Sequence, residues 1–347
     1  MKPLEHYLTQ TQKELFNMLR TKYRTCADTF VLKNKYILVK GEAPVMLLAH
    51  LDTVHKERVK TICRSDNGNI LMSPQGIGGD DRCGVYALNA VYEQAKVKPW
   101  LLFTCDEEVG GVGASAFCEK HGKGRLPKEL SNLKLLIEID RKGRNDAVYY
   151  DCENPEFESY ITGKGFATEW GSFSDISYVA PALGVAAVNL SSGYYNAHTL
   201  HEYINRKHLN QTVKKVLEIV DESTAPNFPR FEYIEAVRSF GRGWGHWGND
   251  YYYDRGSSAL RPKNLSPTKG DKVIELEPDY DGADLSHIPD SIREEYFALL
   301  DFYTPEELDA MREEMGDGAI TMLCQSEFGE DYYGMFGYDE EEEVLPQ

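Results

Sequence analysis

The feature that most constrains the fold of this 347-residue chain is an alternation of short apolar runs with helix-like segments. Several runs are apolar throughout, as expected for strands that other elements cover on both faces. Such alternation predicts an α/β domain, a three-layer sandwich around a central mixed, mostly parallel sheet. The expected strands are residues 30–40, 45–49, 100–105, 133–139 and 185–190, and the expected helices are residues 82–96, 112–121, 154–162 and 205–221, besides an amphipathic helix near the N-terminus.

Charge divides the chain into two parts. Residues 1–230 hold 29 basic and 28 acidic side chains, whereas residues 231–347 hold 9 and 28, so the net charge of −18 lies in the last third. Nucleic-acid binding and docking on anionic lipid both need a basic surface, so we expect neither partner. The amino-acid composition changes after residue 225, where Gly and aromatic residues become frequent and the apolar periodicity is lost. We therefore predict one globular domain at residues 1–225 and an acidic, Gly- and aromatic-rich extension, partly irregular, at residues 226–347.

Within the extension, two short helices are expected. One starts near Ser291 and the other at Thr304, because each of these residues is followed three positions later by a glutamate, Glu294 or Glu307. Residues 240–258 have the composition of a linker, and the acidic tract at residues 339–347 is typical of disorder. The extension admits three roles: a solvated tail, a docking segment for a basic partner, or a cover over a cleft.

Cysteine usage and the absence of long apolar runs indicate the compartment. The seven cysteines are scattered and never form a C-x-x-C pair, which favours reduced thiols over disulfides or a Cys-type zinc site. No apolar run approaches the roughly 20 residues that span a bilayer, and the charged N-terminal segment is unlike a signal peptide. A cytoplasmic protein is expected.

Acids and histidines gather in five short segments, four of which follow a predicted strand directly. Ligands of open α/β sheets bind in the crevice beyond the carboxyl ends of the strands. Jointly the segments offer an imidazole and carboxylate mixture that zinc, manganese or cobalt accepts. They are LLAHLDT (47–53), GIGGDDRCG (76–84), TCDEEVGG (104–111), IEIDRKG (137–143) and YYNAHTLHEY (194–203).

Each residue taken singly also has a plain structural interpretation. His50 and Asp52 share one side of a strand, as a metal ligand and its orienting carboxylate would, or as a satisfied histidine at a strand end. Asp80 and Asp81 follow a Gly-rich turn and precede a helix. A carboxylate there either bridges two cations or caps the helix.

The acidic run after residue 105 is harder to explain structurally. Asp106, Glu107 and Glu108 repel one another unless cations or solvent compensate, and adjacent extended residues point in opposite directions. One glutamate would then bind metal while its neighbour faces a water, or all three form a solvated loop cluster. Asp140 ends another apolar run and His198 lies in a loop, and each alone is also compatible with a structural role.

As a set, the motifs H-L-D-T, G-G-D-D-R-x-G, D-E-E-V-G, E-I-D and N-A-H-x-x-H-E resemble those of the co-catalytic, di-zinc metallopeptidases. This superfamily includes single-domain zinc aminopeptidases and peptidase T. All five motifs match in the same order, so the resemblance covers roughly residues 1–220. It implies a zinc-exopeptidase-like fold and two divalent metal ions, with zinc as first choice and manganese or cobalt as alternatives.

Site roles follow from the resemblance, position by position. The implied metal ligands are His50, Asp80, Glu108, Asp140 and His198. Asp80 would bridge the two ions, with His50 and Asp140 on the first and Glu108 and His198 on the second. Glu107 would be the general base, and Asp52 would orient His50. His201 is a substitute for His198, Tyr194 and Tyr195 are candidate oxyanion donors by proximity, and the Asp80–Asp81 bond is often cis in the family.

The resemblance implies an exopeptidase, foremost an aminopeptidase that hydrolyses peptide bonds with a water between two metal ions. Its substrate would be a peptide or small amide. The alternatives are another binuclear amidohydrolase (dipeptidase, carboxypeptidase or deacylase) and an inactive member that interacts through its acidic tail. Only 57 residues (141–197) separate Asp140 from His198, too few for the lid domain of peptidase T and its closest relatives. The single-domain aminopeptidases are therefore the better match.

Overall fold

The computed structural model describes residues 2–236, 273–276, 287–300, 303 and 305–328. The chain divides into two compact units, residues 1–276 and 277–347. The helices that the structure describes include none with both the length and the apolar character needed to cross a membrane.

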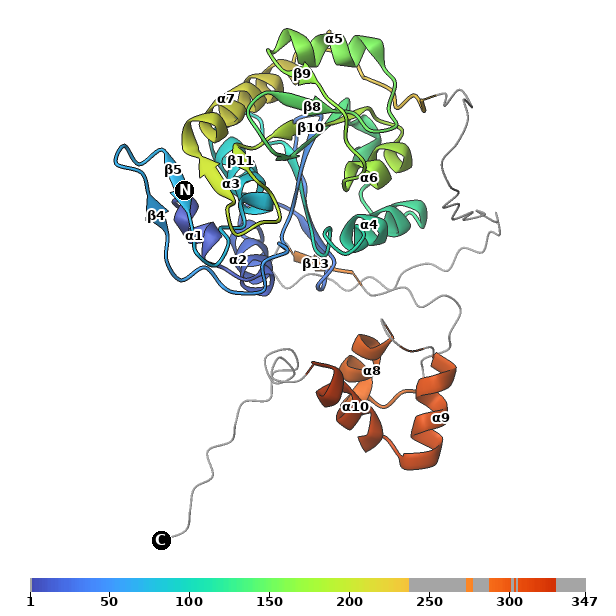
Figure 1. Ribbon diagram of the computed structural model, residues 1–347. Helices are drawn as coiled ribbons and strands as arrows, with labels where there is room; N and C mark the ends of the chain where they lie inside the picture. The colour runs from blue at the N-terminus through green and yellow to red at the C-terminus, as the bar shows by residue number, and fades with distance from the viewer. Residues whose placement is uncertain (1, 237–272, 277–286, 301–302, 304, 329–347) are drawn as a thin grey trace, which may run out of the picture. The chain divides into compact units, whose positions relative to one another are not determined.

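A nine-stranded sheet forms the centre of the first unit (Figure 1). Its four central strands, β6, β3, β7 and β10, run parallel, and five of its eight neighbouring pairs are parallel. The sheet is thus mixed and mostly parallel, as predicted. In spatial order the strands are β13 (Val273–Glu275), β1 (Thr29–Leu32), β2 (Tyr36–Val39), β6 (Trp100–Thr104), β3 (Val45–His50), β7 (Leu135–Arg141), β10 (Ala187–Ser191), β8 (Asp146–Val148) and β9 (Ala167–Thr168).

Helices cover both faces of this sheet (Figure 1). Leu47 and Ala49 of β3 pack into a core shared with α1 (Leu4–Leu8), α2 (Gln12–Tyr23), α3 (Gly79–Gln94), α5 (Pro155–Gly163) and α7 (Arg206–Ser223). Met46 and Leu48 of the same strand pack into a second core, with α4 (Val112–Gly122) and α6 (Ile176–Leu183). Because alternate residues of a strand point to opposite faces, the two cores lie on opposite sides of the sheet, and the three-layer architecture is confirmed.

Residues 30–40 form a hairpin instead of the single strand expected from the sequence. β1 and β2 pair antiparallel, and the turn between them passes through Asn34, whose φ is 57°. Two lysines flank Asn34, so the polar KNK triplet interrupts the apolar pattern. Asparagine accepts the left-handed backbone of a tight turn better than most residues, which explains the reversal here.

A smaller sheet of four strands carries part of the site. β11 (Tyr194–Tyr195), β12 (Tyr203–Asn205), β5 (Ile70–Met72) and β4 (Cys63–Arg64) lie in this order, all antiparallel. The β11–β12 connection contains His198, so this sheet decides where that side chain lies. No strand in it exceeds three residues, which is too short for a recognisable sequence pattern.

The first compact unit continues beyond the expected boundary at residue 225. Phe231 is buried, and its N–H donates to the Lys134 carbonyl oxygen at 2.8 Å. Further along, β13 pairs with the outer edge of β1 in parallel. Residues 226–236 and 273–276, which the sequence assigned to the extension, therefore complete the core and the edge of the central sheet.

In the second unit, three helices surround a small apolar core. α8 (Arg293–Leu299), α9 (Pro305–Met315) and α10 (Gly318–Phe328) bury Ile288, Tyr296 and Ile320 among them. The capping box predicted at Ser291 is wrong, because a 3-10 turn, η2 (Asp290–Ile292), comes first and makes Ile292 the N-cap without a side-chain bond. α9 begins at Pro305, the residue after the expected start at Thr304, and α10 was not foreseen. The predicted linker at 240–258 and the acidic tract at 339–347 lie outside the described residues.

Candidate metal centre

The five predicted ligands converge at the carboxyl edge of the central sheet. His50 is the last residue of β3, Asp140 is the last but one of β7, and Glu108 follows β6. Asp80 lies at the start of α3, and His198 comes from the β11–β12 connection. The parallel strands β6, β3 and β7 bring three of these segments side by side, as the sequence predicted.

Asp80 lies between the two histidines. Its Oδ1 is 3.1 Å from His50 Nε2, and its Oδ2 is 3.2 Å from His198 Nε2. His50 Nε2 also lies 3.6 Å from Asp140 Oδ1, and His198 Nε2 lies 3.1 Å from Glu108 Oε1. The side chains therefore form two candidate ligand sets, His50–Asp80–Asp140 and Asp80–Glu108–His198, that share one carboxylate.

Asp52 ties the first histidine to the acidic loop. Its Oδ1 lies 3.1 Å from His50 Nδ1, and its two oxygens accept the backbone N–H groups of Glu107 and Glu108 at 3.1 and 3.0 Å. A carboxylate at Nδ1 favours the tautomer with its proton there, and this tautomer would leave Nε2, which faces Asp80 and Asp140, to bind a cation. One carboxylate thus orients an imidazole and fixes the loop that carries the next two acids.

Glu107 lies beside both ligand sets. One of its carboxylate oxygens, a ring nitrogen of His50 and a carboxylate oxygen of Glu108 all lie within 4.8 Å of one another. Burial raises the pKa of Glu107 to about 9, and the negative charges of Asp140 and Asp175 act in the same direction. Glu107 would therefore be protonated at neutral pH without cations, whereas two nearby cations would lower its pKa and leave a carboxylate that can accept a proton.

Glu202, which the sequence analysis did not single out, positions Asp80. It is fully buried, and it accepts the N–H groups of Gly78 and Asp80, both at 3.0 Å, as well as His55 Nε2 at 2.8 Å. The Asp80–Asp81 bond is cis, in keeping with the resemblance. The one available signal was the place of Glu202 at the end of the N-A-H-x-x-H-E motif.

Neutral polar side chains form hydrogen bonds with the backbone of Asp140. Its N–H donates to Asn189 Oδ1 at 2.9 Å, and the Tyr194 hydroxyl donates to its carbonyl oxygen at 2.9 Å. Ser174 donates its hydroxyl to the buried carboxylate of Glu138, two residues before Asp140. Asn189 and Ser174 carry no charge and lie in unremarked segments, so no sequence signal pointed to them.

Other candidates from the sequence take up structural contacts. The Tyr194 hydroxyl is engaged by Asp140, and the Tyr195 hydroxyl lies 2.6 Å from His208 Nδ1. His201 is exposed and belongs to none of the ligand groups found in the described residues. Of the two histidines in this loop, His198 is the one that faces the acids.

The donor set fits divalent cations. Burial raises the pKa of Asp140 to about 7 and that of Asp81 well above its usual range, because buried carboxylates crowd one another here. Asp81 Oδ2 is buried and has no hydrogen-bond partner among the described residues. One carboxylate oxygen of Asp81 lies within 4.8 Å of possible ligand atoms of His50 and Asp140. Cations would offset this crowding. The donors are nitrogen and oxygen, which suit zinc, manganese or cobalt.

Comparison with known proteins gave matches among solved structures alone. No family model matches, and no curated protein does. The chain resembles solved peptidase structures. They include a tripeptidase from Staphylococcus aureus, at 16% identity and a TM-score of 0.48 over 63% of this chain and 96% of that one.

Two further structures have similar scores. The aminopeptidase PepT from Bacillus cereus has 13% identity and a TM-score of 0.46 over 64% of this chain and 98% of that one. The aminopeptidase LapA from Legionella pneumophila has 16% identity and a TM-score of 0.44 over 65% of this chain and 70% of that one.

Proposed function

We propose that this protein is a metal-dependent exopeptidase of the aminopeptidase type, which hydrolyses peptide bonds at a centre of two divalent ions. The observation that carries the proposal is the position of Asp80, with one oxygen on the His50 side and the other on the His198 side. A carboxylate shared by two ligand sets is the arrangement that binuclear hydrolases use.

The ligand roles follow the two sets. His50, Asp80 and Asp140 would hold the first ion, and Asp80, Glu108 and His198 the second. Two such ions would supply an activated water at neutral pH and polarise the scissile carbonyl.

Two further residues, Glu107 and Asp52, would transfer protons and keep the ligands in position. Glu107 would accept a proton on its carboxylate from the attacking water and pass it to the leaving amine nitrogen. Asp52 would keep His50 in the required tautomer and hold the Glu107–Glu108 backbone.

Two divalent ions would offset the charges of Asp80, Glu107, Glu108 and Asp140, so charge alone does not select the end of the peptide that enters the site. A hollow of about 410 Å³ is lined by Lys142, Gly143, Asp146, Tyr195, Asn196 and Ala197. We place the remainder of a short peptide there.

The test is metal reconstitution of the full chain. After chelation, zinc, manganese or cobalt is added back, bound ions are counted, and aminoacyl, dipeptide and N-acylated substrates are compared. We expect about two ions per chain and cleavage of substrates with a free amino terminus. A protein without affinity for these ions would contradict the proposal and favour an inactive interaction module. Cleavage confined to N-acylated substrates would indicate a deacylase.

A further inference from the structure

We propose that Gln12, at the start of α2, is a positioning residue for the loop that carries Glu107 and Glu108. It acts through Asp106, the one member of the Asp106–Glu107–Glu108 run to which the metal centre gives no role. The inference rests on the proposed function, because it assumes that Glu107 and Glu108 serve catalysis and metal binding.

The contact between Gln12 and Asp106 is reciprocal. Gln12 Nε2 donates to Asp106 Oδ1 at 2.8 Å, and the Asp106 N–H donates to Gln12 Oε1 at 3.1 Å. The two residues are 94 positions apart in the chain, so the pair joins the N-terminal helices to the edge of the central sheet. Both ends of one amide are used, which fixes its orientation as well as its distance.

Gln12 is itself held rigidly. It is the first residue of α2, and the residue before it, Thr11, forms a capping box with Glu14: Thr11 Oγ1 accepts the Glu14 N–H, and Glu14 Oε2 accepts the Thr11 N–H. The start of the helix therefore has a fixed geometry, and a contact made from it transmits that geometry.

Asp106 sets the direction in which the chain enters the loop. Its φ is 60°, a left-handed backbone that residues other than glycine seldom adopt. The next two N–H groups, of Glu107 and Glu108, are held by Asp52. Three consecutive residues are thus held by side chains from two distant segments, with Gln12 holding the first.

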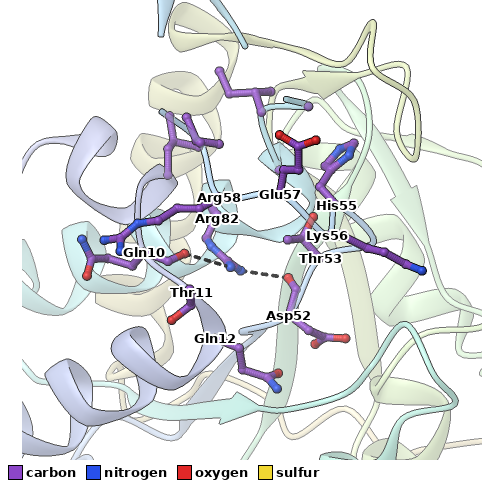
Figure 2. A pocket seen from close by; sticks show the side chains of 15 residues that line it. Gln10, Thr11, Gln12, Asp52, Thr53, His55, Lys56, Glu57, Arg58 and Arg82 are labelled. Carbon is purple, nitrogen blue, oxygen red and sulfur yellow. Dashed lines mark hydrogen bonds between the residues drawn. The ribbon is translucent and has the colours of Figure 1, made fainter. Parts of the chain in front are cut away.

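Arg82 links the same N-terminal segment to the backbone of Asp52 by hydrogen bonds. Its guanidinium donates to the carbonyl oxygens of Gln10 at 3.2 Å and Asp52 at 2.9 Å. Figure 2 shows this group between Gln10 and Asp52, with Gln12 on the neighbouring part of the segment. A cavity of about 280 Å³ is lined by parts of residues 8–12, 52–59 and 76–78, so polar contacts supplement the apolar packing of α1 and α2 here.

Exchange of the amide for a carboxylate tests the role. Gln12→Glu keeps the shape and the oxygen that accepts from Asp106 N–H, but it places a second carboxylate oxygen against Asp106 Oδ1. We expect kcat to fall roughly 10- to 100-fold with KM nearly unchanged, and affinity for the more weakly held ion to fall by a similar factor, as for other groups that orient metal ligands. Ion affinity is measured by competition with a chromophoric chelator, independently of turnover.

The rescue variant combines Gln12→Glu with Asp106→Asn. The amide introduced at position 106 then donates to the carboxylate introduced at position 12, which restores the side-chain hydrogen bond with donor and acceptor exchanged, while the backbone N–H of position 106 still donates to position 12. We expect kcat and ion affinity within about threefold of the original protein. The matched control is Gln94→Glu, the same change at the far end of α3, where the side chain bonds only within its own helix among the described contacts; it should alter neither quantity.

The outcomes separate this inference from the proposed function. If the unaltered protein binds two ions but cleaves no peptide, the proposed function fails, and ion affinity still tests Gln12. Unchanged kcat and ion affinity in Gln12→Glu would overturn the positioning role, as would a lower melting temperature with both quantities intact. Failure of the double variant to recover would overturn it as well.

Discussion

At the residue scale, the site depends on carboxylates with distinct partners. Asp80 faces two histidines, Asp52 holds one histidine and two backbone N–H groups, and Glu202 holds the backbone of Asp80. The side chains share one chemistry, but in the proposed centre their different partners would give them different functions: Asp80 would bridge the two ions, Asp52 would orient His50, and Glu202 would support Asp80. Exchanges of an acid for its amide separate these functions, because the amide keeps the shape and removes the charge.

Glu107→Gln should leave ion binding intact and abolish most turnover. Glu107 is assigned to neither ligand set, but it is the one acid placed to accept the proton of the attacking water, so kcat should fall about 10²- to 10⁴-fold. Peptide hydrolysis is measured together with ions bound per chain. Glu57→Gln, on an exposed stretch of the loop after β3, is the matched control. Normal hydrolysis by Glu107→Gln would show that the role given to Glu107 is wrong.

Glu202→Gln should weaken ion binding and stability together. Glu202 accepts three hydrogen bonds from Gly78, Asp80 and His55, and an amide replaces one acceptor by a donor that faces donors. Leaving a buried group unsatisfied costs about 1–3 kcal/mol in the free energy of unfolding. Urea unfolding and chelator competition measure the two effects. A variant with unchanged values of both would contradict the supporting role.

At the element scale, much of the central sheet was predictable and the small sheet was not. β3, β6, β7 and β10 are apolar runs, so their existence and the convergence of His50 and Asp140 at one edge followed from the sequence. The strands of the second sheet have two or three residues, too few for a periodic pattern. Edge strand β13 could not be foreseen, because its pairing with β1 is decided by the tertiary fold.

The same division applies to the site. Charged ligands directly after apolar strands were visible in the sequence, because such positions are unusual without a function. Supporting groups such as Asn189, Ser174 and Gln12 are neutral, and the acidic residues that they contact in these bonds lie 36 or more positions away. Spacing along the chain carries no information about such contacts.

The hairpin turn between β1 and β2 offers a test of the unexpected reversal at residues 33–35. Asn34→Val should destabilise the fold by about 1–2 kcal/mol, because a β-branched residue is disfavoured at a φ of 57°. Asn34→Gly is the control and should be near neutral, since glycine adopts this conformation freely. Urea unfolding gives both values. Equal stability of the valine and glycine variants would contradict the left-handed backbone conformation of Asn34.

At the scale of the whole molecule, the two compact units differ in content. Every residue assigned to the metal centre lies within residues 1–276, whereas the second unit is a small three-helix core in the acidic third of the chain. The net charge of −18 therefore says little about the site, since residues 1–230 are close to neutral.

A chain cut after Leu276 should keep its fold and its two ions, whereas a cut after Ala225 should not fold stably. The shorter chain loses β13 and Phe231, whose ring lies 5.0 Å from that of Phe157 and 5.5 Å from that of Tyr160. Removal of such a buried ring alone costs about 3–5 kcal/mol. Thermal unfolding and ion counting compare the two chains. Equal stability would show that residues 226–276 are dispensable for the first unit.

The most direct measurement is anomalous X-ray diffraction at the zinc edge from crystals of the metal-loaded protein. Two peaks about 3.5–4 Å apart are predicted, one on each side of Asp80, with His50 and Asp140 at the first and Glu108 and His198 at the second. A single peak, or peaks away from Asp80, would contradict a binuclear centre.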